Sequence, residues 1–200
     1  MLRHSENFKK RFPYETTIFK NYEKSSEGRL PEYIEYFKNT KFLLYQPLSE
    51  KWYPLNTDNL LKYLPDTCVK VSMAYLYNDA IWGGNFSGVE HDAIYGDIDL
   101  NGSSWATKER FDYCQNVLRE REKHTDIKVA DFIENNIKYI KLFYTQNHVT
   151  ITLLREVCRQ LFDILGMEND IIDIHYSESY GTSGGYGTTE DSRLALGLTY

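Results

Sequence analysis

The stretch Phe42-Leu-Leu-Tyr-Gln46 is a short, continuous apolar run that ends at Pro47. A run of this length, bounded in this way, is typical of a strand that is buried on both faces of a sheet. A second strand is predicted at Cys68-Val-Lys-Val-Ser-Met73, where apolar and polar residues alternate. Each strand follows a predicted helix. The order helix, strand, helix, strand indicates parallel βαβ units.

The two helices in this half of the chain have recognisable ends. Pro31 suits the first turn of the helix that precedes the first strand. Thr57 or Asp58 is expected to cap the helix between the strands, and Pro65 to stop it.

The second half of the chain is predicted to be helical. Helices are expected from a cap at Ser103 or Ser104 to about Lys123, over about 129–142, and over about 151–165, with Gly166 as the C-cap of the last. The predicted fold class is therefore α/β, with a small, mostly parallel sheet, flanking helices and a helical C-terminal half.

Length and composition predict one domain. The 200 residues fit a single α/β domain over 1–176, followed by a flexible tail rich in Gly, Ser and Thr over 177–200. Neither a secretory leader nor a membrane span is apparent, which predicts a cytoplasmic protein. The net charge of −6 argues against nonspecific nucleic-acid binding. The three cysteines are scattered, and we expect Cys114 and Cys158 to be buried small hydrophobes.

Ligands of open α/β sheets usually bind beyond the carboxyl ends of the strands. Tyr45 and Gln46 end the first predicted strand, and a long aromatic and glycine-rich loop, about 74–103, follows the second. This loop is interpreted as lining a ligand site, with Trp82, Asn85 and His91 as its candidate substrate contacts.

His148 is the best-placed histidine for chemistry. It lies just before the last predicted helix, in the loop that starts at Phe143. A helix N-terminus offers free backbone N–H groups and a positive field, which suit an anion and favour a neutral imidazole that can act as a general base. A structural role for a histidine at such a position is the alternative. No metal-binding, P-loop, nucleophile-elbow or kinase motif occurs, and no metal is expected.

Several short motifs occur in a particular order along the chain: Phe42-Leu-Leu-Tyr-Gln-Pro-Leu48, the helix end Lys62-Tyr-Leu-Pro65 with the strand after it, Leu118-Arg-Glu-Arg-Glu122 with Asp126, Asp131-Phe-Ile133 and Leu142-Phe-Tyr-Thr-Gln-Asn-His148. With these motifs, the chain resembles the WcbI-like family of capsular polysaccharide biosynthesis proteins over roughly residues 14 to 166. The resemblance implies an acetyltransferase that uses coenzyme A, with acetyl-CoA as donor, to modify a hydroxyl group of a carbohydrate.

The resemblance also implies roles for particular residues. Tyr45 and Gln46 would contact the cofactor. Asn147 and His148 would be the catalytic polar pair, and Arg121 and Glu122 a supporting ion pair.

The chain departs from the family pattern in two places. Members usually begin with a strand that ends in a Gly-Asn-Cys-Gln turn, which supplies a candidate nucleophile, and this sequence contains no such turn. Val149 stands where the family tends to have a proline. Three functions therefore stay open: an acyltransferase in which the sugar hydroxyl attacks the thioester directly, a CoA- or sugar-binding protein without turnover, and a carbohydrate esterase.

Overall fold

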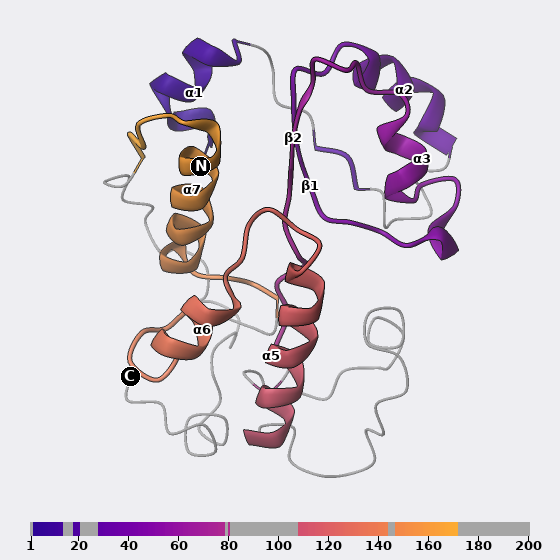
Figure 1. The fold of residues 1–200 in the computed structure, drawn as a ribbon. Coiled ribbons are helices and arrows are strands. Elements are labelled where there is room, and N and C mark those ends of the chain that lie inside the picture. Colours follow the sequence, from indigo (N-terminus) through magenta and orange to yellow (C-terminus); the bar gives the residue numbers. More distant parts are fainter. Residues whose placement is uncertain are drawn as a thin grey trace, which may run out of the picture. The chain divides into compact units, whose positions relative to one another are not determined.

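Figure 1 shows the chain as a computed structural model, in which the described residues are 2–13, 18–20, 28–78, 80, 108–143 and 147–171. The chain forms two compact units, each described by itself below. The described residues of the first unit lie within 2–75, 121–128 and 155–171, and those of the second lie within 76–120 and 129–154. The fold class is α/β, as predicted. The predictions of one domain over 1–176 and of a tail over 177–200 stay predictions, and the tail lies outside the described residues.

The sheet of the first unit consists of two parallel strands, β1 (Phe42–Tyr45) and β2 (Val69–Ser72), in which Tyr45 lies opposite Ser72. Both strands were predicted from their apolar patterns. Beyond β2, the bridge between Met73 and Ile127 runs parallel as well. Ile127 therefore extends the β2 side of the sheet, whereas no strand among the described residues pairs with the other edge of β1.

The expected burial of the first strand on both faces is wrong. All four residues of β1 are only half-buried, whereas Val71 and Ser72 of β2 are buried. The apolar pattern predicted the strand correctly, but burial on both faces needs neighbours that the local sequence does not specify.

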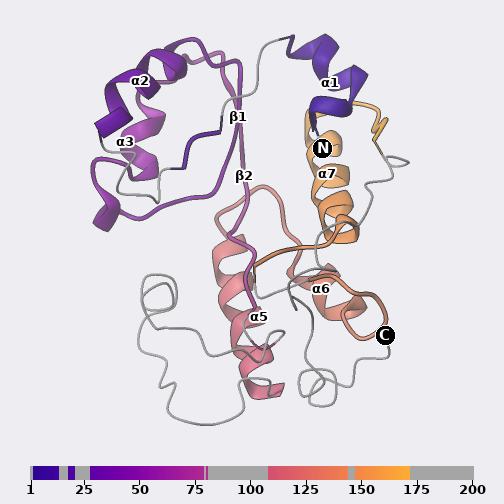
Figure 2. The ribbon, with the colours of Figure 1, turned by 180° about the vertical axis from the view of Figure 1, so that it is seen from behind.

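Two helices, α2 (Leu30–Lys38) and α3 (Thr57–Leu61), lie to one side of the strands in both views (Figures 1 and 2). Pro31 is in the first turn of α2, as predicted. The expected cap on α3 is wrong, because Asn56 holds the N-cap position and the hydroxyl of Thr57 accepts a hydrogen bond from Leu48 N at 2.7 Å instead. The buried core of this side comprises Tyr33, Phe37, Leu60, Leu64 and Cys68.

Helix α1 (Glu6–Arg11) follows a short 3-10 turn, η1 (Leu2–His4), and is capped by the buried Ser5, whose hydroxyl accepts from Phe8 N at 2.8 Å. Asn7 N donates to the carboxylate of Asp170 at 3.0 Å. This bond ties the start of α1 to the chain that follows α7 (Ile151–Leu165). A second 3-10 turn, η3 (Glu50–Trp52), follows β1.

Helix α7 ends as predicted, at a C-cap glycine. Gly166 has φ +59°, in the left-handed region, and Met167 N donates to Phe162 O at 3.0 Å. This pairing is the main bond of the Schellman motif.

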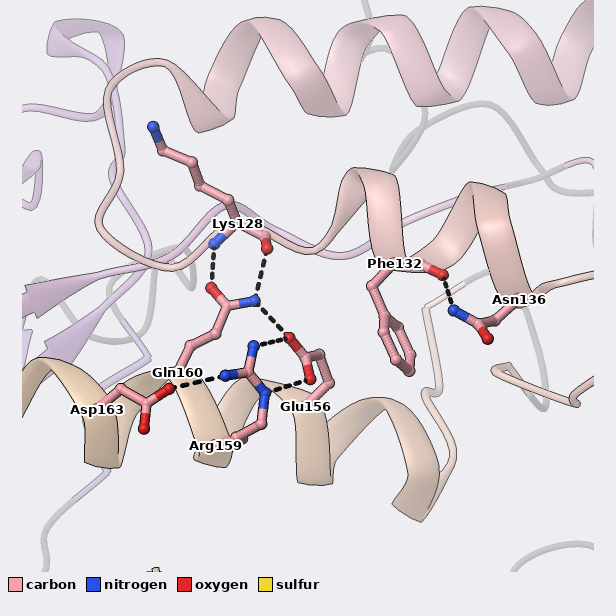
Figure 3. Close-up of polar contacts among 7 residues, drawn as sticks. All are labelled: Lys128, Phe132, Asn136, Glu156, Arg159, Gln160 and Asp163. Carbon is pink, nitrogen blue, oxygen red and sulfur yellow. Dashed lines mark hydrogen bonds and ion pairs between the residues drawn. The ribbon is translucent and has the colours of Figure 1, made fainter. Parts of the chain in front are cut away.

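Polar side chains join the first-unit part of α7 to the segment before α6 (Figure 3). The Gln160 amide accepts from Lys128 N at 2.8 Å and donates to Lys128 O at 2.7 Å, so one side chain satisfies both backbone groups.

The second unit contains α6 (Ala130–Asn136) and most of α5 (Lys108–Glu122). Phe111, Cys114, Leu118 and Ile133 are buried there. The helix expected over 129–142 is much shorter, and Ile140, which the apolar spacing of that expected helix places on its inward face, is 39% exposed. The expected cap at Ser103 or Ser104 lies outside the described residues. Across the described helices, none combines the length and apolar character that a membrane crossing needs.

Candidate functional site

The carboxyl end of β1 borders a cavity of 730 Å³ within the first unit. Tyr45 and Gln46, the two predicted cofactor residues, both line this cavity. Met73, which follows β2, and Thr57, the first residue of α3, line it as well. The structure therefore brings the ends of both strands and the start of α3 to one hollow, which is where ligands of α/β sheets usually bind.

Aromatic rings form two groups around this cavity. Phe8, Phe12 and Phe42 make one group, with ring centroids 5.0 to 5.2 Å apart. In the second group, Phe19 stacks on Tyr33 at 4.0 Å and meets Phe37 at 5.6 Å. All six side chains line the cavity. Its walls are therefore suited to apolar or planar ligand groups.

The carboxyl end of β2 is fixed by Asp126. The Asp126 carboxylate accepts hydrogen bonds from Ser72 N and Ser72 Oγ, both at 2.7 Å. In return, Asp126 N donates to Ser72 Oγ at 3.1 Å. Ser72 lies opposite Tyr45 in the sheet. Asp126 thus holds in place the strand end beside the candidate cofactor residues, although the sequence indicated no site role for it.

Arg121 and Glu122, the predicted supporting pair, lie at the end of α5 in the first unit. Glu122 is buried and Arg121 half-buried. A buried carboxylate at this helix end is unlike the solvated charge run that a local reading of Arg119-Glu-Arg-Glu122 favours. Their pairing with each other stays a prediction.

Asn147 and His148 lie in the second unit, just before α7. The chain turns back on itself here, because Phe143 and Val149 form an antiparallel bridge and Thr150 N donates to Leu142 O at 2.9 Å. The Thr150 hydroxyl also donates to Lys141 O at 2.9 Å. His148 is exposed, and α7 begins at Ile151. The position close to a helix start is as predicted, and the catalytic role stays a prediction.

None of the three cysteines is suited to be a nucleophile. Cys68, Cys114 and Cys158 are all buried, in line with the expectation for the last two. Burial raises the pKa of Cys158 to about 11, and burial also raises the pKa of Cys68. Because the thiolate is the reactive form, a raised pKa and burial both suppress reactivity.

The predicted substrate contacts Trp82, Asn85 and His91 lie outside the described residues. Before them, Asn78 is only 2% exposed, its Oδ1 accepts from Ala80 N at 3.2 Å, and its Nδ2 has no hydrogen-bond partner. Such an amide is a binding candidate, because buried polar groups are rarely left unpaired. Its signal in the sequence is a polar residue that ends the apolar run 74–77. Among the described residues, no group of three or more metal-ligating side chains could hold an ion.

The chain is similar to one protein family and to one solved structure. Residues 103–170 match the model of the family described as "Polysaccharide biosynthesis enzyme WcbI". A solved structure of WcbI, described as a novel polysaccharide biosynthesis enzyme, shares the fold, with a TM-score of 0.58 and 22% sequence identity. That similarity covers 75% of this chain and 60% of the WcbI chain. The structure is of the native protein without a disulfide bond between CoA and one of its cysteines. No curated protein matches the chain.

Proposed function

Because this chain resembles the WcbI family of polysaccharide biosynthesis enzymes, as its sequence predicted, we propose that it is an acyl-CoA-dependent O-acyltransferase that acts on a carbohydrate. The resemblance implies acetyl-CoA as the donor. The observation that carries the proposal is the cavity at the carboxyl end of β1, because both residues assigned to the cofactor line it.

Tyr45 and Gln46 are proposed to contact the CoA. Gln46 is exposed and its amide carries both a hydrogen-bond donor and an acceptor. It can therefore bind a polar part of the cofactor at the carboxyl end of β1. The Tyr45 ring provides an apolar surface with a polar tip. Trp82, Asn85 and His91 are proposed to contact the carbohydrate acceptor. Arg121 and Glu122 are proposed to support the site.

The reaction is an acyl transfer from sulfur to oxygen. The oxygen of a sugar hydroxyl attacks the thioester carbonyl carbon, a C–O bond forms, and the C–S bond then breaks. The proton leaves the hydroxyl for an imidazole nitrogen of His148 and passes on to the departing sulfur. The products are the sugar ester and CoA with a free thiol. Asn147 is proposed to donate a hydrogen bond to the oxyanion of the tetrahedral intermediate.

Direct attack by the hydroxyl is favoured over an intermediate in which one of the three cysteines of this sequence carries the acyl group. A thiol nucleophile needs a lowered pKa or an adjacent base, together with access to the donor. The three cysteines are buried, and the pKa of Cys158 is raised to about 11. None of them meets these requirements.

The test is the transfer of the acyl group from acetyl-CoA to a panel of saccharides. We expect His148→Ala to lower the rate by about 10²–10⁴-fold, the usual contribution of a general base. His124→Ala is the matched control, because His124 is also an exposed histidine but lies two residues after the end of α5. Equal rates for the wild type and His148→Ala, or no transfer by the wild type, contradict the proposal. Release of acetate that does not depend on CoA would indicate an esterase instead.

A binding protein of the same fold is the second candidate, and the burial of every cysteine favours it. Calorimetric titration with CoA and with the same saccharides distinguishes the two. Binding without turnover supports the binding protein, and turnover excludes it.

A further inference from the structure

We propose that the cavity beside β1 binds the hydrocarbon chain of the acyl donor, so that the enzyme prefers a medium- or long-chain acyl-CoA to acetyl-CoA. This inference rests on the proposed function and specifies its acyl group.

The size of the cavity is the first reason. Its volume of 730 Å³ lies within the range of roughly 300–1,000 Å³ that is usual for pockets that enclose a whole small ligand. Six consecutive residues, Lys41 to Gln46, line it. Because a strand rises about 3.3 Å per residue, the four residues of β1, all of which line the cavity, span about 10 Å. An acetyl group would leave nearly all of this length empty.

The lining is the second reason. Phe42, Leu43 and Leu44 follow one another along the cavity, and all three are apolar. Successive residues of a strand point to opposite faces, so these side chains lie on both faces of β1. They can line one cavity because no described strand covers the outer edge of β1. The rings of Phe8 and Phe12 meet Phe42 at the end away from Gln46. A hydrocarbon chain that starts near Gln46 would therefore run along apolar side chains to an aromatic end.

The charges around the cavity suit an anionic ligand such as acyl-CoA. Lys20 and Lys41 both line it. The carboxylate of Glu35, which also lines it, forms an ion pair with Lys38 at 2.5 Å. Lys38 thus offsets the charge of Glu35, and Lys41 favours the phosphates of CoA over a neutral lipid.

The test compares the affinities of the full chain for CoA, acetyl-CoA, octanoyl-CoA and dodecanoyl-CoA by calorimetry. Burial of one methylene group is worth about fourfold in affinity. We therefore expect octanoyl-CoA and dodecanoyl-CoA to bind at least about tenfold more tightly than acetyl-CoA, a conservative figure because the chain also loses freedom on binding.

Two variants test where the hydrocarbon chain of the ligand binds. Leu44→Phe adds volume to the middle of the cavity, and we expect it to lower the ratio of dodecanoyl-CoA to acetyl-CoA affinity about tenfold. Phe12→Ala opens the aromatic end, and we expect it to shift the preference toward longer chains. Ile164→Phe, on the exposed side of α7 and outside the cavity lining, is the matched control and should change neither. Circular dichroism verifies that each variant is folded, and Phe12→Ala alone carries the test where Leu44→Phe unfolds.

The outcomes separate this inference from the proposed function. Equal affinities for acetyl-CoA, octanoyl-CoA and dodecanoyl-CoA would overturn the inference and leave CoA binding intact, and the open edge of β1 would then suit an extended peptide strand better. A chain-length preference that neither cavity variant alters would also overturn it. Failure of every CoA compound to bind would overturn the proposed function together with the inference.

Discussion

Glu156 is a largely buried carboxylate that pairs with Arg159, since its side chain is only 12% exposed. Its two oxygens accept from Arg159 Nε at 2.8 Å and Arg159 Nη2 at 2.7 Å (Figure 3). A third bond comes from Gln160 Nε2 at 2.8 Å. The hydrogen bonds from Arg159, helped by the one from Gln160, lower the pKa of Glu156 against the opposing effect of burial.

This lowered pKa predicts a dependence of stability on pH. The folded state holds the charged form of Glu156 better than the unfolded state does, so the contribution is fully present above the ordinary pKa of 4.5. It is lost as the pH falls through the lower value of the folded state. We expect Glu156→Gln to remove this part of the acid dependence, measured as the free energy of urea unfolding between about pH 7 and pH 3.

Glu35→Gln is the control for this prediction, since Glu35 is 69% exposed in its pair with Lys38 and an exposed pair contributes little. Parallel pH profiles for the wild type and Glu156→Gln would show that Arg159 does not favour the charged form.

Gln160 carries a second prediction, because its amide pairs with both backbone groups of Lys128. Gln160→Ala leaves these groups without their side-chain partner. We expect a loss of about 1–2 kcal/mol in the free energy of unfolding, measured with urea. Asn39→Ala is the control, because the Asn39 amide makes one exposed bond, to Glu35 O at 3.1 Å. An equal loss of unfolding free energy in both variants would mean that the two hydrogen bonds to Lys128 do not stabilise the protein.

At the scale of elements, the end of α7 depends on the backbone of one residue. Gly166 has φ +59°, and a Cβ built there would meet no atom within 4 Å. Gly28 has equally open surroundings without a positive φ. The two glycines therefore differ in backbone conformation and not in space.

We expect Gly166→Ala to lower the free energy of unfolding by about 1–2 kcal/mol, because a side chain strains the left-handed conformation. Gly28→Ala should be neutral or slightly stabilising, since it restricts only the unfolded chain. Thermal unfolding of both variants measures the difference. Similar melting temperatures would show that α7 can end without the left-handed residue.

The elements that sequence analysis predicted well have local signals. The strands at β1 and β2 follow from their apolar patterns, and the ends of α2 and α7 follow from Pro31 and Gly166. The early end of α6 was not predicted, because the apolar spacing continues to Ile140 although that side chain is exposed. Apolar spacing shows which face of a helix can be buried, but not how far the surrounding chain buries it.

In the candidate site as well, the residues with a local sequence signal were predicted and those without one were not. Tyr45 and Gln46 were predicted because strand ends are recognisable in sequence, and they line the cavity. Thr57 lines it too, yet the sequence indicated only a helix cap. Ser72 and Asp126 are 54 positions apart, so no local pattern could reveal their hydrogen bonds. Contacts between distant segments depend on packing, which one sequence read locally does not contain.

At the scale of the whole molecule, the chain passes repeatedly between its two compact units. Helix α5 continues from Glu120 in the second unit to Arg121 in the first, and α7 continues from Leu154 to Arg155. A helix is cooperative along its length. We therefore expect the two units to unfold together, as one domain over 1–176 requires.

A substitution that destabilises one unit tests this expectation when the stability of the other unit is measured. Ile133 is fully buried in the second unit, so Ile133→Ala should cost about 2–5 kcal/mol. Amide hydrogen exchange then reports on β1 and β2, which belong to the first unit. Cooperative unfolding predicts that the most slowly exchanging amides in both strands lose protection. The loss should equal the whole decrease in unfolding free energy that Ile133→Ala causes. Ile140→Ala, in the same unit but at a side chain that is 39% exposed, should have little effect. Loss of protection confined to α5 and α6 would instead make the units separate domains, because the continuous helices would then fail to couple them.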